Sequence, residues 1–167
     1  MMKEQVKHNL EPVFDGNSRI LILGTMPSRK SREAGFYYAH PQNRFWRVIA
    51  EVLSQELPIT IEEKKTMLFE NHIALWDVLR ICNIKGSDDS SIDNPIANDM
   101  SVILSHANIK AIYTTGVKAT TLYRKYCYPE TKIDAIYLPS TSAANCARYS
   151  CINLIRAYQC ILKHITS

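Results

Sequence analysis

The chain has 167 residues, of which 46% are hydrophobic and 22% are charged, and its formal net charge is +4. This length suits one domain with its own core, and the composition excludes disordered and collagen-like classes. No apolar run approaches the roughly 20 residues that a membrane helix needs, and the first residues contain no apolar signal core, so membrane insertion and secretion are not expected. We therefore expect one cytoplasmic domain over residues 1–167, with residues 1–17 as an N-terminal segment.

The hydrophobic pattern predicts strands and helices in alternation. In chain order the expected elements are a strand at 19–24, a helix at 45–53, a helix opened by a capping box at Thr60 and Glu63 and ending near 71, a strand at 73–77, a loop at 86–95, a helix at 97–105, a strand at 109–115, a helix at 117–126, a strand at 135–138 and a long helix at 144–164. Such alternation is typical of the α/β class. It predicts a three-layer α/β/α sandwich around a central, mostly parallel sheet of four strands.

Five cysteines are present, an odd number without a close Cys-x-x-Cys pair; they stand at positions 82, 127, 146, 151 and 160. This pattern favours reduced thiols that pack as small hydrophobic side chains. We therefore expect no disulfide framework, no metal site and no cofactor.

The segment 24–47 carries the whole excess of positive charge. It contains five basic residues and one acid, whereas the rest of the chain has equal numbers of both, and it interleaves them with aromatic side chains. Basic residues neutralise phosphates and aromatic faces stack on unpaired bases. The segment also follows a predicted strand, and ligands of parallel sheets bind beyond the carboxyl ends of the strands. The pattern indicates nucleic-acid binding, with a solvated loop and an ordinary amphipathic helix as the alternative.

Several motifs resemble one enzyme superfamily. The run His40-Pro-Gln-Asn-Arg-Phe-Trp46 is similar to the mismatch-specific branch of the uracil-DNA glycosylases. The runs around Met26-Pro-Ser28, Phe36-Tyr-Tyr38, Ala74–Val78 and Leu138–Ser142 resemble the branch described as hypoxanthine-DNA glycosylases. The resemblance implies a small α/β/α protein that acts as a monomer on DNA. It would flip a deaminated base, chiefly hypoxanthine with uracil as a second candidate, out of the duplex and hydrolyse the N-glycosidic bond without a metal or nucleophilic side chain.

Two positions depart from the superfamily pattern. Met26 stands where most relatives have Asn or Asp to position water, and Leu138 stands where many have a side chain that contacts the leaving base. A thioether orients water poorly and Leu has no donor. The resemblance to the hypoxanthine branch moves the catalytic role to Asn43, whose alternative role is to cap the helix that starts at Arg44.

The resemblance and the strand ends also suggest how the base is held. Tyr38 is the candidate for stacking on the flipped base, with core packing as its alternative. Asp77, if ionised, could accept from the N1–H of hypoxanthine, or it could cap a helix. His40 could donate to the base or a phosphate, or be structural. The backbone N–H groups of Thr25 and Met26 could hold a base oxygen.

Further side chains are predicted to contact DNA; they are Arg29, Lys30, Arg32, Arg44, Ser140, Ser142, Asn145 and Arg148. In the second loop Ala143 replaces the proline that is usual in the hypoxanthine branch, so any wedge would come from Asn145 or Arg148. A focused patch on a neutral body predicts a modest salt dependence of binding. A DNA-binding module without catalysis is the alternative function, and the absence of phosphate-loop and dinucleotide motifs argues against a nucleotide hydrolase or flavodoxin-like protein.

Overall fold

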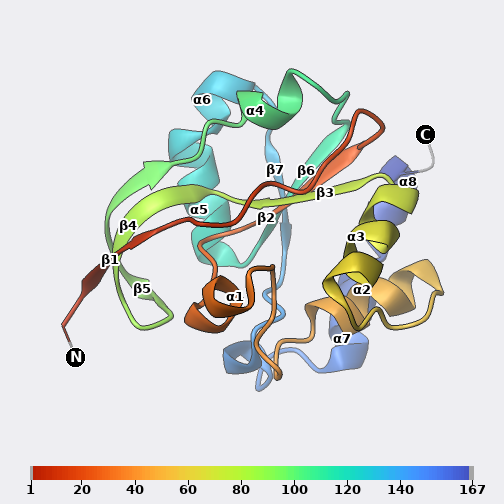
Figure 1. The fold of residues 1–167 in the computed structure, drawn as a ribbon, viewed down its shortest axis with the longest axis horizontal. Coiled ribbons are helices and arrows are strands. Elements are labelled where there is room, and N and C mark those ends of the chain that lie inside the picture. The colour runs from red at the N-terminus through yellow and green to blue at the C-terminus, as the bar shows by residue number, and fades with distance from the viewer. Residues whose placement is uncertain (1, 166–167) are drawn as a thin grey trace.

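The computed structural model describes residues 2–165 and contains a four-stranded parallel sheet at its centre (Figure 1). The strands are β2 (Ile20–Gly24), β3 (Ile73–Asp77), β6 (Ala111–Thr115) and β7 (Ala135–Leu138), in the order β3-β2-β6-β7. All three pairings are parallel, and Gly24 lies beside Asp77 at the ends of β2 and β3. The four predicted strands and the mostly parallel sheet are confirmed.

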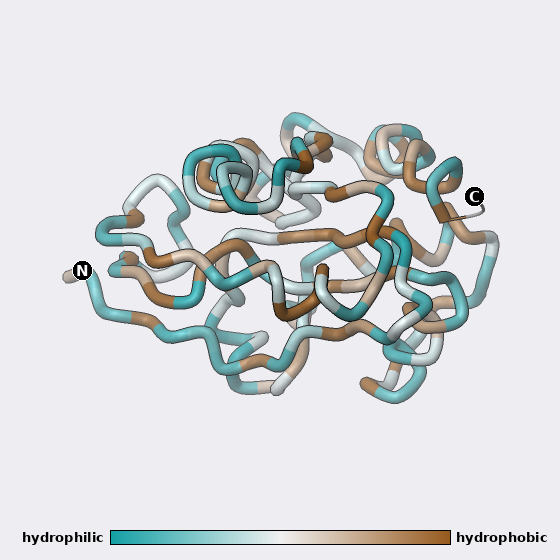
Figure 2. The backbone as a smooth tube through the Cα atoms, turned by 90° about the horizontal axis from the view of Figure 1, so that it is seen from above, coloured by the Kyte–Doolittle hydropathy of each residue, from teal (hydrophilic) through white to brown (hydrophobic). Residues whose placement is uncertain are grey.

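Helices cover both faces of this sheet. Every residue of β2, β3 and β6 is buried, as expected when neither face meets water. On β6 the Tyr113 hydroxyl donates to the Cys160 carbonyl in η2 (Gln159–Ile161), whereas the next side chain, Thr114, bonds Thr120 in α5 (Val117–Tyr126). Successive strand side chains point to opposite faces, so the predicted three layers are present. In Figure 2 hydrophobic stretches run through the middle layer, while hydrophilic residues dominate the outer loops.

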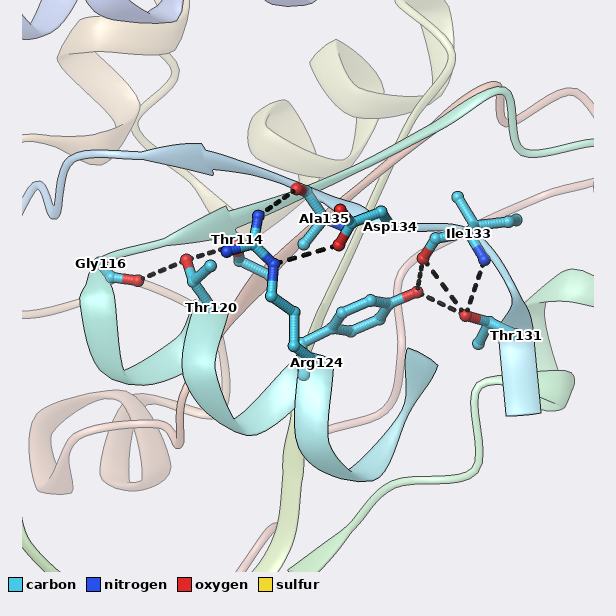
Figure 3. A network of polar contacts seen from close by, with 9 residues as sticks. Thr114, Gly116, Thr120, Arg124, Thr131, Ile133, Asp134 and Ala135 are labelled. Atoms are coloured by element: carbon cyan, nitrogen blue, oxygen red, sulfur yellow. Dashed lines mark hydrogen bonds and ion pairs between the residues drawn. The ribbon is translucent and has the colours of Figure 1, made fainter. Parts of the chain in front are cut away.

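The predicted helix at 117–126 is confirmed as α5, and polar contacts tie both of its ends to the strands (Figure 3). Thr120 Oγ1 donates to the Gly116 carbonyl at 2.8 Å, next to the end of β6. At the other end Arg124 donates to the Asp134 carboxylate at 3.1 Å and to the Ala135 carbonyl at 3.2 Å. The first contact fixes the turn at Gly116, and the Arg124 contacts fix the other end of α5 to the start of β7.

Helices α2 (Phe45–Leu53) and α3 (Ile61–Glu70) also follow the prediction, and the capping box between Thr60 and Glu63 is present. The basic segment contains a further short helix, α1 (Arg29–Ala34), that was not predicted. Its start is capped by the Ser28 hydroxyl, and Gly35 ends it with a left-handed φ of 78°.

The prediction of a loop at 86–95 is wrong. These residues belong largely to β5 (Asp88–Ala97), which pairs antiparallel with β4 (Leu79–Lys85) and forms a second sheet with β1 (Glu4–Lys7). Gly86 at φ 62° opens the two-residue turn between Lys85 and Asp88. Pairing with β4 overrides the weak strand propensity of this polar run, most of which stays exposed.

Two predicted helices are too long. Only α4 (Ser101–Leu104) forms within 97–105, because Ala97 ends β5 and the Asn98 side chain binds the Asp77 and Leu79 carbonyls. The long helix at 144–164 is broken into the 3₁₀ turn η1 (Ala143–Asn145), α7 (Cys151–Tyr158), η2 and α8 (Leu162–Ile165). The Ser150 hydroxyl caps α7 and so ends the preceding turn.

Within residues 2–165, no helix is long and apolar enough to cross a membrane. In the same part of the chain, no three His, Cys, Asp or Glu side chains gather as a potential metal site. The five cysteines are free thiols. Burial raises the pKa of Cys82 and of Cys127 to about 11, which suits the predicted packing as small hydrophobic groups.

Candidate active site

A pocket of about 370 Å³ lies at the carboxyl ends of the parallel strands. Five parts of the chain build it: the turn 24–28 with Ser31 and Arg32 of α1, the segment 37–43, the strand ends at Asp77 and Thr115, the β4–β5 hairpin, and the loop 140–144 after β7. Figure 1 shows α1, the hairpin and the chain after β7 in the lower half of the view. The volume lies within the range of small-ligand pockets, roughly 300–1,000 Å³.

Three side-chain oxygens gather around Gly24 at the floor of this pocket. A Cβ atom added to Gly24 would lie 2.5 Å from Asp77 Oδ1, 3.2 Å from the Tyr38 hydroxyl and 3.7 Å from Thr115 Oγ1. Only a residue without a side chain therefore lets the carboxylate and the phenol converge here. Thr115 donates to the Leu23 carbonyl at 3.3 Å, which holds its hydroxyl against the sheet.

Asp77 is buried and bound to a residue that the sequence did not single out. Its Oδ2 lies 2.8 Å from Nε2 of His8, and the two side chains are 5% and 3% exposed. The chain continues from Asp77 into β4, so the alternative role as a helix cap is not realised. No local signal marks His8, because its contact joins positions 69 residues apart.

Tyr38 has a left-handed φ of 52° and lines the pocket. Its ring stacks on Phe45 with the centroids 3.9 Å apart and the planes 10° apart, so core packing, the alternative to stacking on a flipped base, occupies this face of the ring. Its hydroxyl oxygen is buried and has no hydrogen-bond partner among the described residues. Burial raises the pKa of Tyr38, and the charge of Asp77 raises it further. The group is thus a neutral phenol whose hydroxyl makes no hydrogen bond to the described residues.

Asn43 both supports the start of α2 and lines the pocket. Its Oδ1 accepts the backbone N–H of Phe45 at 2.9 Å and the hydroxyl of Thr141 at 2.8 Å. An amide oxygen has two lone pairs, and both are used here. The amide NH₂ therefore remains for a ligand or water, and Asn43 can act in the pocket as a donor. The predicted alternative as the N-cap is not realised, because α2 begins at Phe45 and its N-cap is Arg44; Asn43 stands one residue before the cap and accepts the first helical N–H.

Asp89 is a second carboxylate in the pocket that sequence reasoning missed, because its strand was expected to be a loop. It accepts from Thr25 Oγ1 at 3.3 Å. The residue as a whole is exposed, but its carboxyl lies in the pocket wall, where partial desolvation raises its pKa and the charge of Asp77 raises it further. The dipeptide Gly86-Ser87 was the available signal, since a glycine-led pair between two strands favours a hairpin.

Arg44 is engaged within the protein. Its guanidinium donates to the carbonyl of Tyr149 and, at 3.1 Å, to that of Ser142, while its backbone N–H donates to Thr141 at 3.1 Å. These bonds connect α2 to the loop after β7. The side chain of Asn145 adds a bond to the Ser140 carbonyl at 2.9 Å.

The other predicted residues divide into two groups. Those that line the pocket are Thr25, Met26, Arg32, His40, Ser140 and Ser142. Those that do not line it are Arg29, Lys30, Arg44, Asn145 and Arg148. The Arg29 side chain is 67% exposed, and its ion pair with Glu4 is long at 3.5 Å. Lys30 and Arg148 are also exposed. Arg32 donates to the Pro27 carbonyl at 2.9 Å. Three cations therefore stand on the surface, outside the pocket.

The parallel sheet, the ligand pocket at its strand ends and the basic surface define an α/β enzyme-like protein. The sequence profile described as the uracil DNA glycosylase superfamily matches residues 11–159, and the chain belongs to this superfamily. The resemblance predicted from the motifs is therefore confirmed.

Two curated relatives carry the name hypoxanthine DNA glycosylase. The protein from Methanosarcina barkeri is 35% identical over 144 residues, which cover 83% of this chain and 88% of the relative. The protein from Methanosarcina acetivorans is 37% identical over 145 residues, which cover 84% and 89%. A solution NMR structure from Methanosarcina acetivorans, described with the uracil DNA glycosylases, has a TM-score of 0.82 and 30% identity, covering 96% of this chain and 99% of that one.

Proposed function

We propose that this protein is a DNA glycosylase that takes a deaminated base, hypoxanthine and secondarily uracil, from DNA into the pocket and hydrolyses its N-glycosidic bond. Membership of the superfamily and the two relatives named hypoxanthine DNA glycosylase support this proposal. The observation that carries it is that Asp77 Oδ1 and the Tyr38 hydroxyl, which makes no hydrogen bond to the described residues, lie near each other at the pocket floor. Water supplies the hydroxyl group added to the sugar, and the base leaves with a proton.

This pair of groups matches one edge of hypoxanthine. The base presents an N1–H donor next to the O6 acceptor, so the Asp77 carboxylate can accept from N1–H while the Tyr38 hydroxyl donates to O6. Adenine presents the opposite order, because its N1 is an acceptor and its N6 amino group is a donor. Uracil has the same N–H and carbonyl arrangement as hypoxanthine, which makes it the second substrate. Repulsion between a carboxylate and the adenine N1 lone pair would reject the undamaged base.

The same groups account for the chemistry. Negative charge grows on the base as its bond to the sugar breaks, and a donor at O6 stabilises that charge. The Tyr38 hydroxyl can be this donor. Its hydrogen bond to O6 would also offset the repulsion between the Asp77 carboxylate and the negative charge on the leaving base. The Asn43 NH₂ group can hold a water against the anomeric carbon by donating to its oxygen, which leaves a lone pair for attack. The reaction needs no nucleophilic side chain.

The surface outside the pocket supplies the DNA contacts. Arg29, Lys30 and Arg148 are exposed and suit phosphate oxygens, while Arg44 supports the loop that carries Ser140 and Ser142. We expect the protein to act on DNA as a monomer in the cytoplasm. Size-exclusion chromatography with light scattering checks the oligomeric state.

A lesion panel tests the function. Duplex oligonucleotides with one hypoxanthine, one uracil or no lesion are incubated with excess protein, and abasic sites are revealed by alkaline cleavage. We expect cleavage at hypoxanthine, weaker cleavage at uracil and none at adenine. Asn43→Ala and Tyr38→Phe should lower the rate, each by about 100-fold, because each removes a donor.

The same panel separates the alternative of a non-catalytic DNA-binding module. If the protein binds the labelled oligonucleotides but releases no base from any of them, the binding module is correct and the glycosylase proposal is wrong. The loss of polar side chains at Met26 and Leu138 is the observation that favours this alternative.

A further inference from the structure

The N-terminal segment contacts Asp77, a residue of the pocket, through the side chain of His8. Strand β1 pairs with β4, and the backbone N–H of His8 continues this pairing with a bond to the Arg80 carbonyl at 2.7 Å. Farther along, Val13 pairs with Leu75 of β3 through two backbone bonds of 2.9 Å. His8 is thus held where the chain passes from the second sheet to the edge of the central sheet.

The hydrogen bonds of the His8 ring define its tautomer. Nδ1 accepts the backbone N–H of Leu10 at 3.3 Å, so in the neutral ring the proton is on Nε2. Nε2 then donates to Asp77 Oδ2 at 2.8 Å. The ring is fixed on both sides and almost fully buried.

The two oxygens of Asp77 have different surroundings. Oδ2 is bound by His8, whereas Oδ1 lies above Gly24, next to the Tyr38 hydroxyl. The terminal torsion of an Asp side chain is soft, so a carboxylate without this bond could rotate away from the pocket floor. The titratable groups that face Asp77 are His8 after β1, Tyr37 and Tyr38 before α2, and Asp89 on β5. His8 is the one nitrogen base in this set.

We propose that His8 is a positioning residue for base recognition: it holds Oδ2 of Asp77 so that Oδ1 stays aimed at the N–H edge of the flipped base. This inference rests on the proposed glycosylase function. A carboxylate that loses this donor can turn about its soft terminal torsion, and Oδ1 then no longer meets the N–H of the base. His8 acts through Asp77 and does not touch the base.

Two variants of similar size separate this role from packing. Gln keeps an N–H near the position of Nε2, so His8→Gln should retain the rate on hypoxanthine within about threefold. His8→Leu keeps the bulk but removes the donor. We therefore expect its rate at about pH 7 to fall by about tenfold or more. Single-turnover rates of the wild type and of both variants measure this.

A double variant tests whether His8 acts through Asp77. If it does, His8→Leu should add no further loss to Asp77→Asn, whereas independent effects would multiply. Thermal unfolding and binding to undamaged duplex serve as controls for folding. Should His8→Leu not fold, the ¹⁵N shifts of the wild-type ring report the tautomer, and Asp77→Asn must alter them.

The outcomes distinguish the inference from the function on which it rests. If wild-type protein releases no hypoxanthine, the proposed function fails and the inference falls with it. If wild-type protein is active but His8→Gln loses as much rate as His8→Leu, and the loss of His8→Leu multiplies with that of Asp77→Asn, only the positioning role is refuted. A wild-type ring protonated on Nδ1 alone would also refute it.

Discussion

Replacing Arg44 by Ala tests whether this side chain holds the second loop or serves mainly as a phosphate contact. In the structure its guanidinium donates to the carbonyls of Tyr149 and Ser142, and the side chain is half-buried. Arg44→Ala leaves both carbonyls without their charged donor. The loop that lines the pocket with Ser140 and Ala143 would then lose its bond to the Arg44 side chain, and only the bonds of Thr141 to the Arg44 backbone and to Asn43 would connect it to the start of α2.

The magnitude follows from the two bonds. A hydrogen bond from a charged donor contributes about 1.5–3 kcal/mol, and the lower value applies because the site is only half-buried. Two such bonds give about 3 kcal/mol. In a chain of this size each kcal/mol shifts Tm by about 2–4 °C, so we expect a decrease of about 6–12 °C. Arg44→Lys keeps one donor and should lose about half as much.

The assay combines thermal unfolding with the salt dependence of DNA binding. Arg47→Ala is the matched control, because Arg47 is exposed on the same helix and its loss should change stability by about 0.5 kcal/mol or less. The opposite pattern would refute the reasoning: a Tm within about 2 °C of wild type together with a salt slope reduced by about one, as expected for a lost phosphate contact.

Three further predictions concern the pocket. Asn43→Ala should lower the free energy of unfolding by about 1 kcal/mol, because it removes the acceptor at the start of α2. Asn43→Asp should preserve it, because a side-chain oxygen remains there. Chemical denaturation of both variants measures the difference. Gly24→Ala should cost about 1–3 kcal/mol through crowding and abolish hypoxanthine release while DNA binding persists, since its Cβ would lie 2.5 Å from Asp77 Oδ1. Asp89 has a raised pKa in the folded state, so its ionisation costs stability as the pH rises above its ordinary value. Asp89→Asn should therefore raise the free energy of unfolding at about pH 7, by less than about 1 kcal/mol, and with it Tm. It should give no gain at about pH 3, where the carboxyl is protonated in both states, and a Tm lowered at about pH 7 would contradict this.

Local patterns predicted the central sheet well. The strands at Ile20–Gly24 and Ala111–Thr115 are continuous apolar runs, and burial on both faces requires such runs whatever surrounds them. The capping box at Thr60 and the apolar spacing of α2 likewise depend on neighbours a few residues away. These signals are short in range, so the amino-acid order is sufficient to detect them.

The elements that were missed depend on distant partners. The polar strand β5 exists because β4 pairs with it, and β1 exists because it pairs with the other edge of β4. The expected long C-terminal helix is divided where Ser150 caps α7 and Arg44 binds the Tyr149 carbonyl. A periodic apolar pattern continues through such a break, so periodicity could not reveal it.

The sequence by itself determined the class of fold, the superfamily and part of the pocket wall, including Tyr38, Asn43 and Asp77. The tertiary structure alone decided how these groups are oriented. It binds the Asn43 oxygen so that its NH₂ remains, and it brings His8 and Asp89 to a carboxylate that lies 69 and 12 positions away. The physical reason is that a hydrogen bond depends on distance in space, and the two sheets create those distances only when the chain has folded. The fold also distributes the basic residues behind the net charge of +4: the Arg44 side chain binds the loop after β7, while Arg29 and Lys30 remain on the surface, where we propose that they contact DNA.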